Sequence, residues 1–410
     1  MEVIHETCAG LDVHKKTVVA CVRKARAGKV ERETRTFATE TKGLIELFDW
    51  LAASECTHVV MESTGVYWKP VWRVLESGFE LVLANASAVK NVPGRKSDVN
   101  DAQWLADLLA HGLVRGSFVP DEQGQDLRDL TRTRKQLVRE QVQHRQRIQK
   151  VLERCNIKLA SVVSDVTGVS GRTILEALIR GERDPVKLAD LAVPKIKHTK
   201  WLPLAKSLQG SVRSHDAFML GVHLRSIDAL QAEIDTIGGR IETILRDRFK
   251  QAIRRLETIP GVSTRVAETI VAEVGIDMSL FKTPGHLVSW AGLCPRMDES
   301  AGKHRNTRIR KGAPWLKTVL VQAAWVAVKK PDSYLRSRFL RLKARRGPMK
   351  AIVAIAAKML VAAYCILRDN VEYTDLGASH LDNLDRDRAT RHHVRRLQAL
   401  GYSVDLRTAA

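Results

Sequence analysis

Four acidic residues in the first quarter of the sequence have types and positions that suit metal binding. Asp12 and Glu62 each end an apolar stretch that is predicted to be a buried strand, and Asp98 and Asp101 stand at the start of a predicted helix. If the two strands pair in parallel, the first two carboxylates lie at one sheet edge, and the other two share a helix face. Such oxygen ligands suit Mg²⁺, and one or two ions could hold the attacking and leaving oxygens of a phosphodiester.

The two helical acids also have a purely structural interpretation. Asp98 could cap its helix and Asp101 could occupy the first turn, where the helix dipole favours acids. Asp12 and Glu62 are harder to explain this way, because a charge set directly against apolar residues is costly unless it is paired. Together the four favour a metal site. Asp107 is predicted to be a solvated helical position, and His14 is the most suggestive histidine because it stands beside Asp12.

A serine in a basic loop forms a second candidate site. Ser300 lies in the segment PRMDESAGKHRNTRIRKGAP, which is rich in Gly and Pro as well as in cations. A serine hydroxyl there could attack phosphorus and form a covalent phosphoserine link, while arginine stabilises the charge of the transition state. A solvated basic contact surface is the other interpretation of the loop. Its candidate nucleic-acid-binding residues are Arg296, Lys303, Arg305, Arg308, Arg310 and Lys311.

A short turn upstream offers another contact with a phosphate backbone. The segment IPGVS, residues 259–263, precedes an apolar helix and resembles a helix-hairpin-helix turn. In such a turn Gly261 would let backbone amides approach a phosphate at a helix N-terminus. An ordinary tight turn between two helices explains the same residues equally well.

The overall charge indicates a polyanionic partner. The 410 residues include 67 Lys and Arg against 46 Asp and Glu, a formal net charge of +21. Such a chain is expected to bind nucleic acid with strongly salt-dependent affinity, although a membrane surface is a competing polyanion. We predict no membrane span, because the longest apolar run, 351–367, is interrupted by Lys358 and suits a buried helix. Scattered cysteines and an N-terminus without a secretory pattern predict a reducing cytoplasm.

The order of the predicted elements defines the expected fold. Three strands are followed by alternating helices and strands up to about residue 110, which is the order of a ribonuclease H-like α/β fold. We predict an α/β catalytic domain over 1–120, long helices with an irregular insert of short helices over 121–255, an all-α domain over 256–369, and a polar tail over 370–410.

Two long helices are predicted in the middle of the chain. The first is basic and runs from Asp126 to about Cys155. The second carries apolar residues at alternating spacings of three and four, which predicts a coiled-coil seam that Gly238 and Gly239 weaken locally. The seam needs a partner helix, either in another copy of the chain or in the same chain. Its residues are Ile227, Leu230, Ile234, Ile237, Ile241 and Ile244.

At these residues the sequence resembles the insertion sequence 110 family of transposases, over nearly its whole length. GLDVHKK, MESTGVYW and KSDVNDAQWLADLL carry Asp12, Glu62, Asp98 and Asp101 in the order of the family's Asp-Glu-Asp-Asp set. The resemblance implies an N-terminal domain similar to the RuvC Holliday-junction resolvase. In the C-terminal half, IPGV and FKTPGHLVSWAGLCPR followed by ES resemble the family's second transposase domain, which implies that Ser300 is its catalytic serine.

The resemblance also implies partners. Members of the family cut and rejoin strands of donor and target DNA under the guidance of a bridge RNA that is encoded at the element's end and pairs with both. They assemble as homo-oligomers, so a dimer or tetramer is expected here. A composite site would form where the carboxylate domain of one subunit meets the serine domain of another.

Two other classes of function stay open from the residues alone. A stand-alone nuclease that hydrolyses DNA junctions would need the four acids but neither Ser300 nor a guide RNA. A non-catalytic nucleic-acid-binding protein would need only the basic charge and the long helices. A covalent protein-DNA adduct separates the transposase from the nuclease, and metal-dependent nicking excludes the binding protein.

Overall fold

The computed structural model divides into two compact units, Met1–Val119 and Pro120–Ala410. Each unit contains buried apolar clusters of its own. The structure describes residues 2–26, 29–62, 65–84, 101–114, 116–246, 249–295, 299–300, 303–304, 308–309, 312–384 and 386–406.

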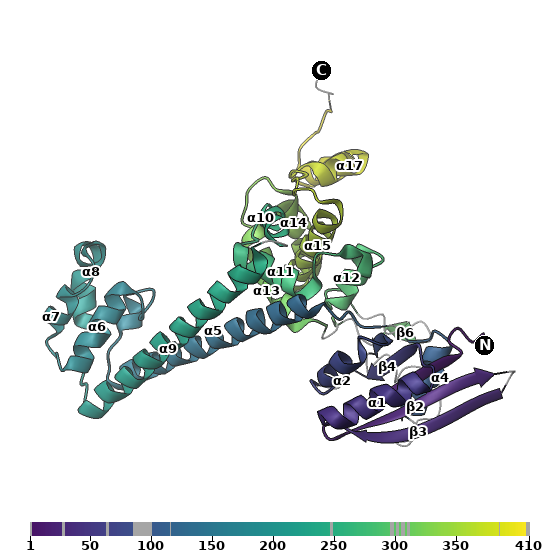
Figure 1. Ribbon diagram of the computed structural model, residues 1–410. Helices are drawn as coiled ribbons and strands as arrows, with labels where there is room; N and C mark the ends of the chain where they lie inside the picture. Colours follow the sequence, from purple (N-terminus) through teal and green to yellow (C-terminus); the bar gives the residue numbers. More distant parts are fainter. Residues whose placement is uncertain are drawn as a thin grey trace. The chain divides into compact units, whose positions relative to one another are not determined.

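The first unit is built on a five-stranded mixed sheet with the order β3-β2-β1-β4-β5. Figure 1 labels β2, β3 and β4 of this sheet. β1, β2 and β3 are antiparallel neighbours, whereas β4 is parallel to both β1 and β5. The predicted mixed α/β class is therefore confirmed, and the parallel pairing on which the common edge of Asp12 and Glu62 depends is present. The elements are β1 Thr7–Val13, β2 Thr17–Arg26, β3 Lys29–Ala38, α1 Thr41–Ala53, β4 His58–Glu62, α2 Trp68–Leu75, β5 Glu80–Ala84 and α4 Asp101–Ala110.

Successive side chains of the strands point alternately to the two faces of the sheet, and both faces carry apolar residues. Helices cover both faces. Leu11 of β1 belongs to the cluster that α1 and α2 complete. Cys8 of β1 and Val60 of β4 belong to the cluster that α4 completes. Because successive side chains of a strand point to opposite faces, Asp12 and Glu62 belong to the face that α4 covers.

A glycine lets α4 lie close to β1. A Cβ atom added at Gly10 would stand 2.2 Å from the carbonyl oxygen of Ala102 and 2.5 Å from the amide nitrogen of Ala106. Both are backbone atoms of α4, so a side chain at this position cannot be accommodated by a change of rotamer. The absence of a Cβ at Gly10 therefore sets the separation between the strand and the helix.

The Gly10→Ala substitution is expected to destabilise the first unit by about 1–3 kcal/mol, the usual cost of overpacking, because α4 must move away from β1. Thermal unfolding would measure this loss. Gly116→Ala is the matched control in the same unit, since its Cβ would only reach ordinary contact, 3.5 Å from Cγ1 of Val82. Equal stability of the two variants would contradict the close packing of α4.

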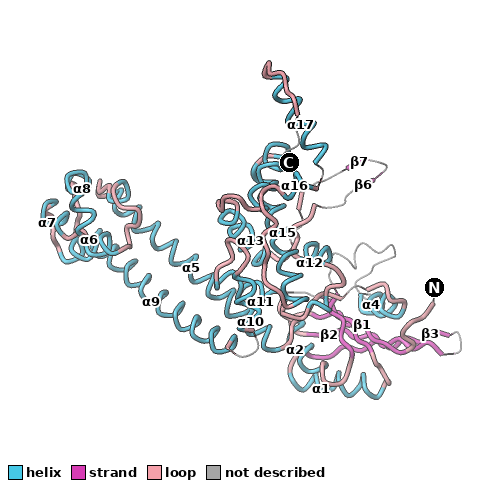
Figure 2. The backbone as a smooth tube through the Cα atoms, turned by 90° about the horizontal axis from the view of Figure 1, so that it is seen from above, coloured by secondary structure: helices cyan, strands magenta, loops and turns pink. Residues whose placement is uncertain are grey.

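The second unit begins with a long antiparallel hairpin of two helices, α5 (Glu122–Arg154) and α9 (Ser214–Leu245). The two lie side by side in both views (Figures 1 and 2). A polar contact crosses the hairpin, because the side-chain amide of Gln141 donates to the carbonyl of Ile227 and, at 3.0 Å, to Oε1 of Gln231. The structure thus confirms the long helix predicted from Asp126 to Cys155, with its start four residues earlier.

The predicted apolar seam of α9 faces a helix of the same chain. Ile227, Ile234 and Ile241 are buried where α9 packs against α5, so this half of the seam has its partner within the chain. Leu230, Ile237 and Ile244 are only partly buried. α9 continues without a break through Gly238 and Gly239, where an added Cβ would meet no atom within 4 Å. The glycines therefore stand on an open side of the helix.

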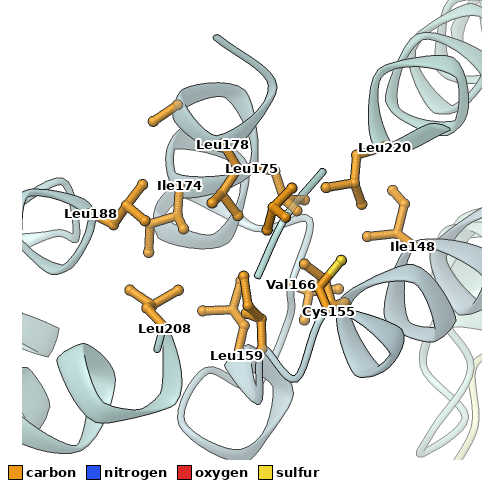
Figure 3. Close-up of a cluster of buried hydrophobic side chains, with 14 of the residues drawn as sticks. Ile148, Cys155, Leu159, Val166, Ile174, Leu175, Leu178, Leu188, Leu208 and Leu220 are labelled. Atoms are coloured by element: carbon orange, nitrogen blue, oxygen red, sulfur yellow. The ribbon is translucent and has the colours of Figure 1, made fainter. Parts of the chain in front are cut away.

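The segment between the hairpin helices is a packed helical subdomain, so the prediction of an irregular linker was wrong. Its helices are α6 (Val169–Arg180), α7 (Pro185–Asp190) and α8 (Pro194–Ser207). Their apolar side chains form one core with the end of α5 and the start of α9 (Figure 3), including Leu175 and Leu220. The predicted short helices are present. Pro185 and Pro194 stand at the starts of α7 and α8, and α8 has a kink at Lys200.

The remainder of the second unit is mostly helical, as predicted. The exception among the described residues is a minimal two-stranded ladder in the predicted serine loop, β6 (Glu299–Ser300) with β7 (Lys303–His304). The helices are α10 Lys250–Glu257, α11 Thr264–Val274, α12 Pro284–Trp290, α13 Pro314–Ala327, α14 Tyr334–Arg346, α15 Pro348–Asp369, α16 His380–Asn383 and α17 Arg386–Ala399.

α15 is the central helix of this region. It packs against α10, α12, α13 and α14, and the hydroxyl of Tyr364 donates to the carbonyl of Phe281 at 2.9 Å. Within the described part of the chain it is the one helix long and apolar enough to cross a membrane, but 56% of its most apolar window is buried in the protein. Packing on four helices agrees with the prediction of a buried helix over 351–367.

Candidate carboxylate and serine sites

The sheet register brings Asp12 and Glu62 together. β1 and β4 pair in parallel with Leu11 opposite Met61, and the same register continued by one residue sets Asp12 beside Glu62. Neighbouring strands are about 4.8 Å apart, and in-register residues of parallel strands point to the same face. The two carboxylates therefore form an adjacent pair where both strands end, on the face covered by α4.

α4 directs its first turn toward this edge. The helix runs opposite to β1, because the amide of Ile4 donates to the carbonyl of Ala110 and the thiol of Cys8 donates to the carbonyl of Ala106. Gly10 lies against Ala102, so Asp12 comes next, at the level of the N-terminal turn. Asp101 is the first residue of that turn, and its Oδ1 is buried. The first turn of α4, which begins at Asp101, therefore lies at the level of Asp12.

A histidine accompanies the acidic pair. Nε2 of His14 lies 3.1 Å from Oδ2 of Asp12, whose side chain is only 18% exposed. Among the residues that the structure describes, no three His, Cys, Asp or Glu side chains form a group that could hold a metal ion. Asp98 lies outside the described residues, so the predicted four-carboxylate metal set stays a prediction.

Asp107 is not the solvated helical position that the sequence predicted. Its carboxylate binds Nε of Arg23 and a guanidinium nitrogen of Arg32, each at 2.9 Å. The side chain of Arg23 is 3% exposed, so the aspartate compensates a buried charge. Asp107 therefore holds α4 on β2 and β3. The partners come from 75 and 84 residues away in the sequence, which no local pattern could have indicated.

The ends of the serine loop are held together by backbone contacts. Pro295 and Ile309 form an antiparallel bridge, and an added Cβ at Gly312 would stand 2.5 Å from the backbone of Gly292. Gly312 also has a φ of 49°, which favours glycine. Gly292, after α12, and Gly312, before α13, therefore lie in backbone contact at the two ends of the loop. A larger residue at either position would be strained.

Ser300 lies in the hairpin between those ends. Its backbone pairs with that of Lys303 in the β6-β7 register. Among the predicted phosphate ligands, Arg308 is exposed. Lys303 is placed by its backbone alone, and the other four lie outside the described residues: Arg296, Arg305, Arg310 and Lys311.

Gly261 has a structural role in the turn between α10 and α11. Its φ is 82°, and an added Cβ would stand 2.4 Å from the carbonyl oxygen of Ala323 and 2.8 Å from the amide of Ala327. Close packing of the turn against α13 therefore explains this glycine by itself. Two helices joined by a short turn agree with the predicted helix-hairpin-helix motif. A contact of this turn with phosphate stays a prediction.

Several arginines of α5 form ion pairs inside the protein, which the sequence did not reveal. Arg132 makes a bidentate pair with Glu273 of α11, both bonds at 2.8 Å, and Glu273 is fully buried. Arg134 binds Glu268 at 2.6 Å. Burial lowers the pKa of Arg128 to about 10, which still leaves it charged at neutral pH. These arginines fasten the hairpin to the helix that follows the 259–263 turn.

The Glu273→Gln substitution is expected to destabilise the contact between α5 and α11 by about 3 kcal/mol. This is the lower end of the range for breaking a buried pair, because the Arg132 side chain is 35% exposed. Hydrogen exchange of the α11 amides should accelerate accordingly. Glu153→Gln is the control, since its pair with Lys158 is exposed on both sides and is worth under about 1 kcal/mol. Unchanged protection of α11 would contradict a stabilising role for the buried pair.

Two transposase family models match the chain in the regions of the two candidate sites. A model of the DEDD transposase domain of IS110 matches residues 9–157, which include Asp12, Glu62, Asp98 and Asp101. A model described as the transposase IS116/IS110/IS902 family matches residues 253–339, which include Ser300. The DEDD domain implies a ribonuclease H-like fold for the first unit, in agreement with its mixed five-stranded sheet.

Curated relatives are similar over most of their length. A probable family 20 transposase of Pseudomonas aeruginosa is 26% identical over 73% of this chain and 80% of its own. The transposase for insertion sequence element IS1111A of Coxiella burnetii is 25% identical over 77% and 79%. An IS110 insertion element protein of Streptomyces coelicolor is 26% identical over 80% and 86%. The chain therefore belongs to the IS110 family of transposases and is a DNA transposase.

Proposed function

We propose that this transposase cuts DNA through two sites, a metal-binding carboxylate site in the first unit and a serine nucleophile in the second. The observation that carries the first part is the register of β1 and β4, which sets Asp12 beside Glu62 under the first turn of α4. The second part is supported by the family match over Ser300. Charge and the DEDD domain both favour a phosphodiester substrate.

The donor atoms available at the sheet edge fit a hard divalent cation. Asp12, Glu62 and Asp101 offer only carboxylate oxygens, which Mg²⁺ prefers, and Asp98 would complete the set. When bound, the ion would supply positive charge against the charge that develops on the phosphate. His14 beside Asp12 would orient that carboxylate.

The chemistry assigned to Ser300 conserves the energy of the phosphodiester bond. Its hydroxyl oxygen attacks phosphorus, one deoxyribose oxygen leaves with a proton, and a phosphoserine ester remains. Attack on that ester by a different strand end reverses the reaction and joins new strands, with release of the serine. No nucleotide hydrolysis is needed for the rejoining.

We further propose the partners implied by the resemblance. A bridge RNA would select donor and target DNA, and two or four copies of the chain would form composite sites from the first unit of one copy and the second unit of another. The reactions would take place in the bacterial cytoplasm, on DNA of the nucleoid. The large positive charge of the chain would favour binding of both the bridge RNA and the DNA.

The test is a cleavage assay on protein that is expressed beside its native flanking DNA. RNA that copurifies is sequenced, and cleavage is measured with and without it, in Mg²⁺ and in EDTA. The proposal predicts a discrete structured RNA and cleavage that requires both that RNA and the metal. Cleavage of DNA junctions by RNA-free protein would instead support a resolvase-like nuclease.

A further inference from the structure

An exposed basic corner joins α14 to α15. It consists of Lys343, Arg345, Arg346 and Lys350, all exposed, around Gly347. Gly347 has a φ of 80°, and an added Cβ would meet no atom within 4 Å, so the corner is open to solvent. It lies beyond residue 339, where the second family match ends.

Packing of the protein does not account for these four cations. α14 contains no acidic residue, and three of its arginines already have local partners. Arg341 pairs with Asp382, Arg338 binds the hydroxyl of Tyr334, and Arg336 binds the carbonyl of Lys329. None of the four corner residues makes an ion pair with an acid in the described part of the chain.

The helix dipole explains only part of the cluster. Cations in the last turn of a helix are favoured by its negative end, which suits Lys343, Arg345 and Arg346. Lys350 stands in the first turn of α15, where the same dipole disfavours a cation. Four like charges within eight residues repel one another, so their combined field attracts a polyanion.

We propose that this basic corner binds phosphates of duplex DNA. The segment KARRGPMK, residues 343–350, contains no aromatic side chain, so it lacks the stacking platform typical of single-strand binding. Flexible cations at a helix end suit the regularly spaced phosphates of a double helix and read no sequence. The inference rests on the proposed function, since it takes DNA as the substrate.

The test compares two variants of the full chain with equal change in charge. In the first, the four corner residues are replaced by Gln. In the control, four exposed cations of the α6 to α8 subdomain are replaced, as Arg180→Gln, Lys187→Gln, Lys195→Gln and Lys206→Gln. Binding of a 30-base-pair DNA duplex is measured against salt concentration. Each lost phosphate contact lowers the slope of log affinity against log salt by about 0.9.

The corner variant is expected to lower that slope by about 3 to 4, and the control variant by less than about 1. Equal slopes for the two variants would overturn the proposal. Lost affinity for duplex RNA with unchanged affinity for DNA would also overturn it. At saturating protein, the corner variant should still form the covalent protein-DNA adduct at Ser300. Ser300→Ala should keep the full slope of log affinity against log salt. Failure of the nucleophile assignment can therefore be distinguished from failure of the basic corner to bind DNA.

Discussion

The Ser300→Ala variant is expected to lose DNA cleavage completely while binding of nucleic acid is unchanged. The substitution removes one oxygen atom, the one that attacks phosphorus, and leaves the charge of the loop intact. The backbone pairing of Ser300 with Lys303 does not involve the side-chain oxygen, so the β6-β7 hairpin should persist. Cleavage of labelled DNA and a binding titration measure the two effects separately.

A second serine in the same region gives the control for this prediction. Ser289 of α12 lies on the helix that leads into the loop, and Ser289→Ala should retain cleavage within a few-fold. If Ser300→Ala cut DNA as fast as the natural protein, Ser300 would not be the nucleophile. The carboxylate site would then have to activate water, as in the alternative of a stand-alone nuclease.

Replacing the paired carboxylates is the second change with a large expected effect. Asp12→Asn and Glu62→Gln should each lower the cleavage rate by at least about 10²–10³-fold, the scale seen when one preorganised electrostatic group is removed. Both substitutions keep the shape of the side chain and remove a negative charge that would hold the metal. Single-turnover cleavage over a range of Mg²⁺ concentrations measures the effect.

The concentration of metal distinguishes a ligand from a structural residue. A lost ligand should raise the Mg²⁺ concentration needed for half-maximal cleavage, and thermal stability should stay near that of the natural protein or rise, because two adjacent acids repel each other. Glu46→Gln, an exposed position on α1, is the matched control and should change neither quantity. Normal cleavage by both site variants would exclude the carboxylate site from catalysis.

The strands of the first unit could be predicted because local patterns define them. Short apolar runs indicated the buried strands β1, β2 and β4, whereas β3 is polar and almost wholly exposed. The parallel pairing of β1 with β4 was a condition of the carboxylate prediction, and only the structure establishes it. The close approach at Gly10 could not be foreseen, since it depends on a helix more than ninety residues away. The periodicity of apolar residues predicts whether a segment is a strand or a helix. It does not predict which distant element that segment packs against.

Charged residues show the same limit. Asp107 and Arg132 both look like solvated helix positions in the sequence, yet each pairs with a buried or nearly buried group from another element. The composition of a basic helix reveals how many cations are present and not which of them are already neutralised. The seam of α9 likewise predicted an apolar partner, and only the hairpin identified it as α5.

A serine of this chain is expected to become covalently bound to the DNA that the protein cuts. The direct measurement is to stop the reaction with denaturant in the presence of Mg²⁺ and the copurifying RNA, digest the protein and the DNA, and locate the attached nucleotide by mass spectrometry. We expect a nucleotide on the peptide that contains Ser300, in the natural protein and not in Ser300→Ala. Cut DNA with free ends and no modified peptide would contradict it.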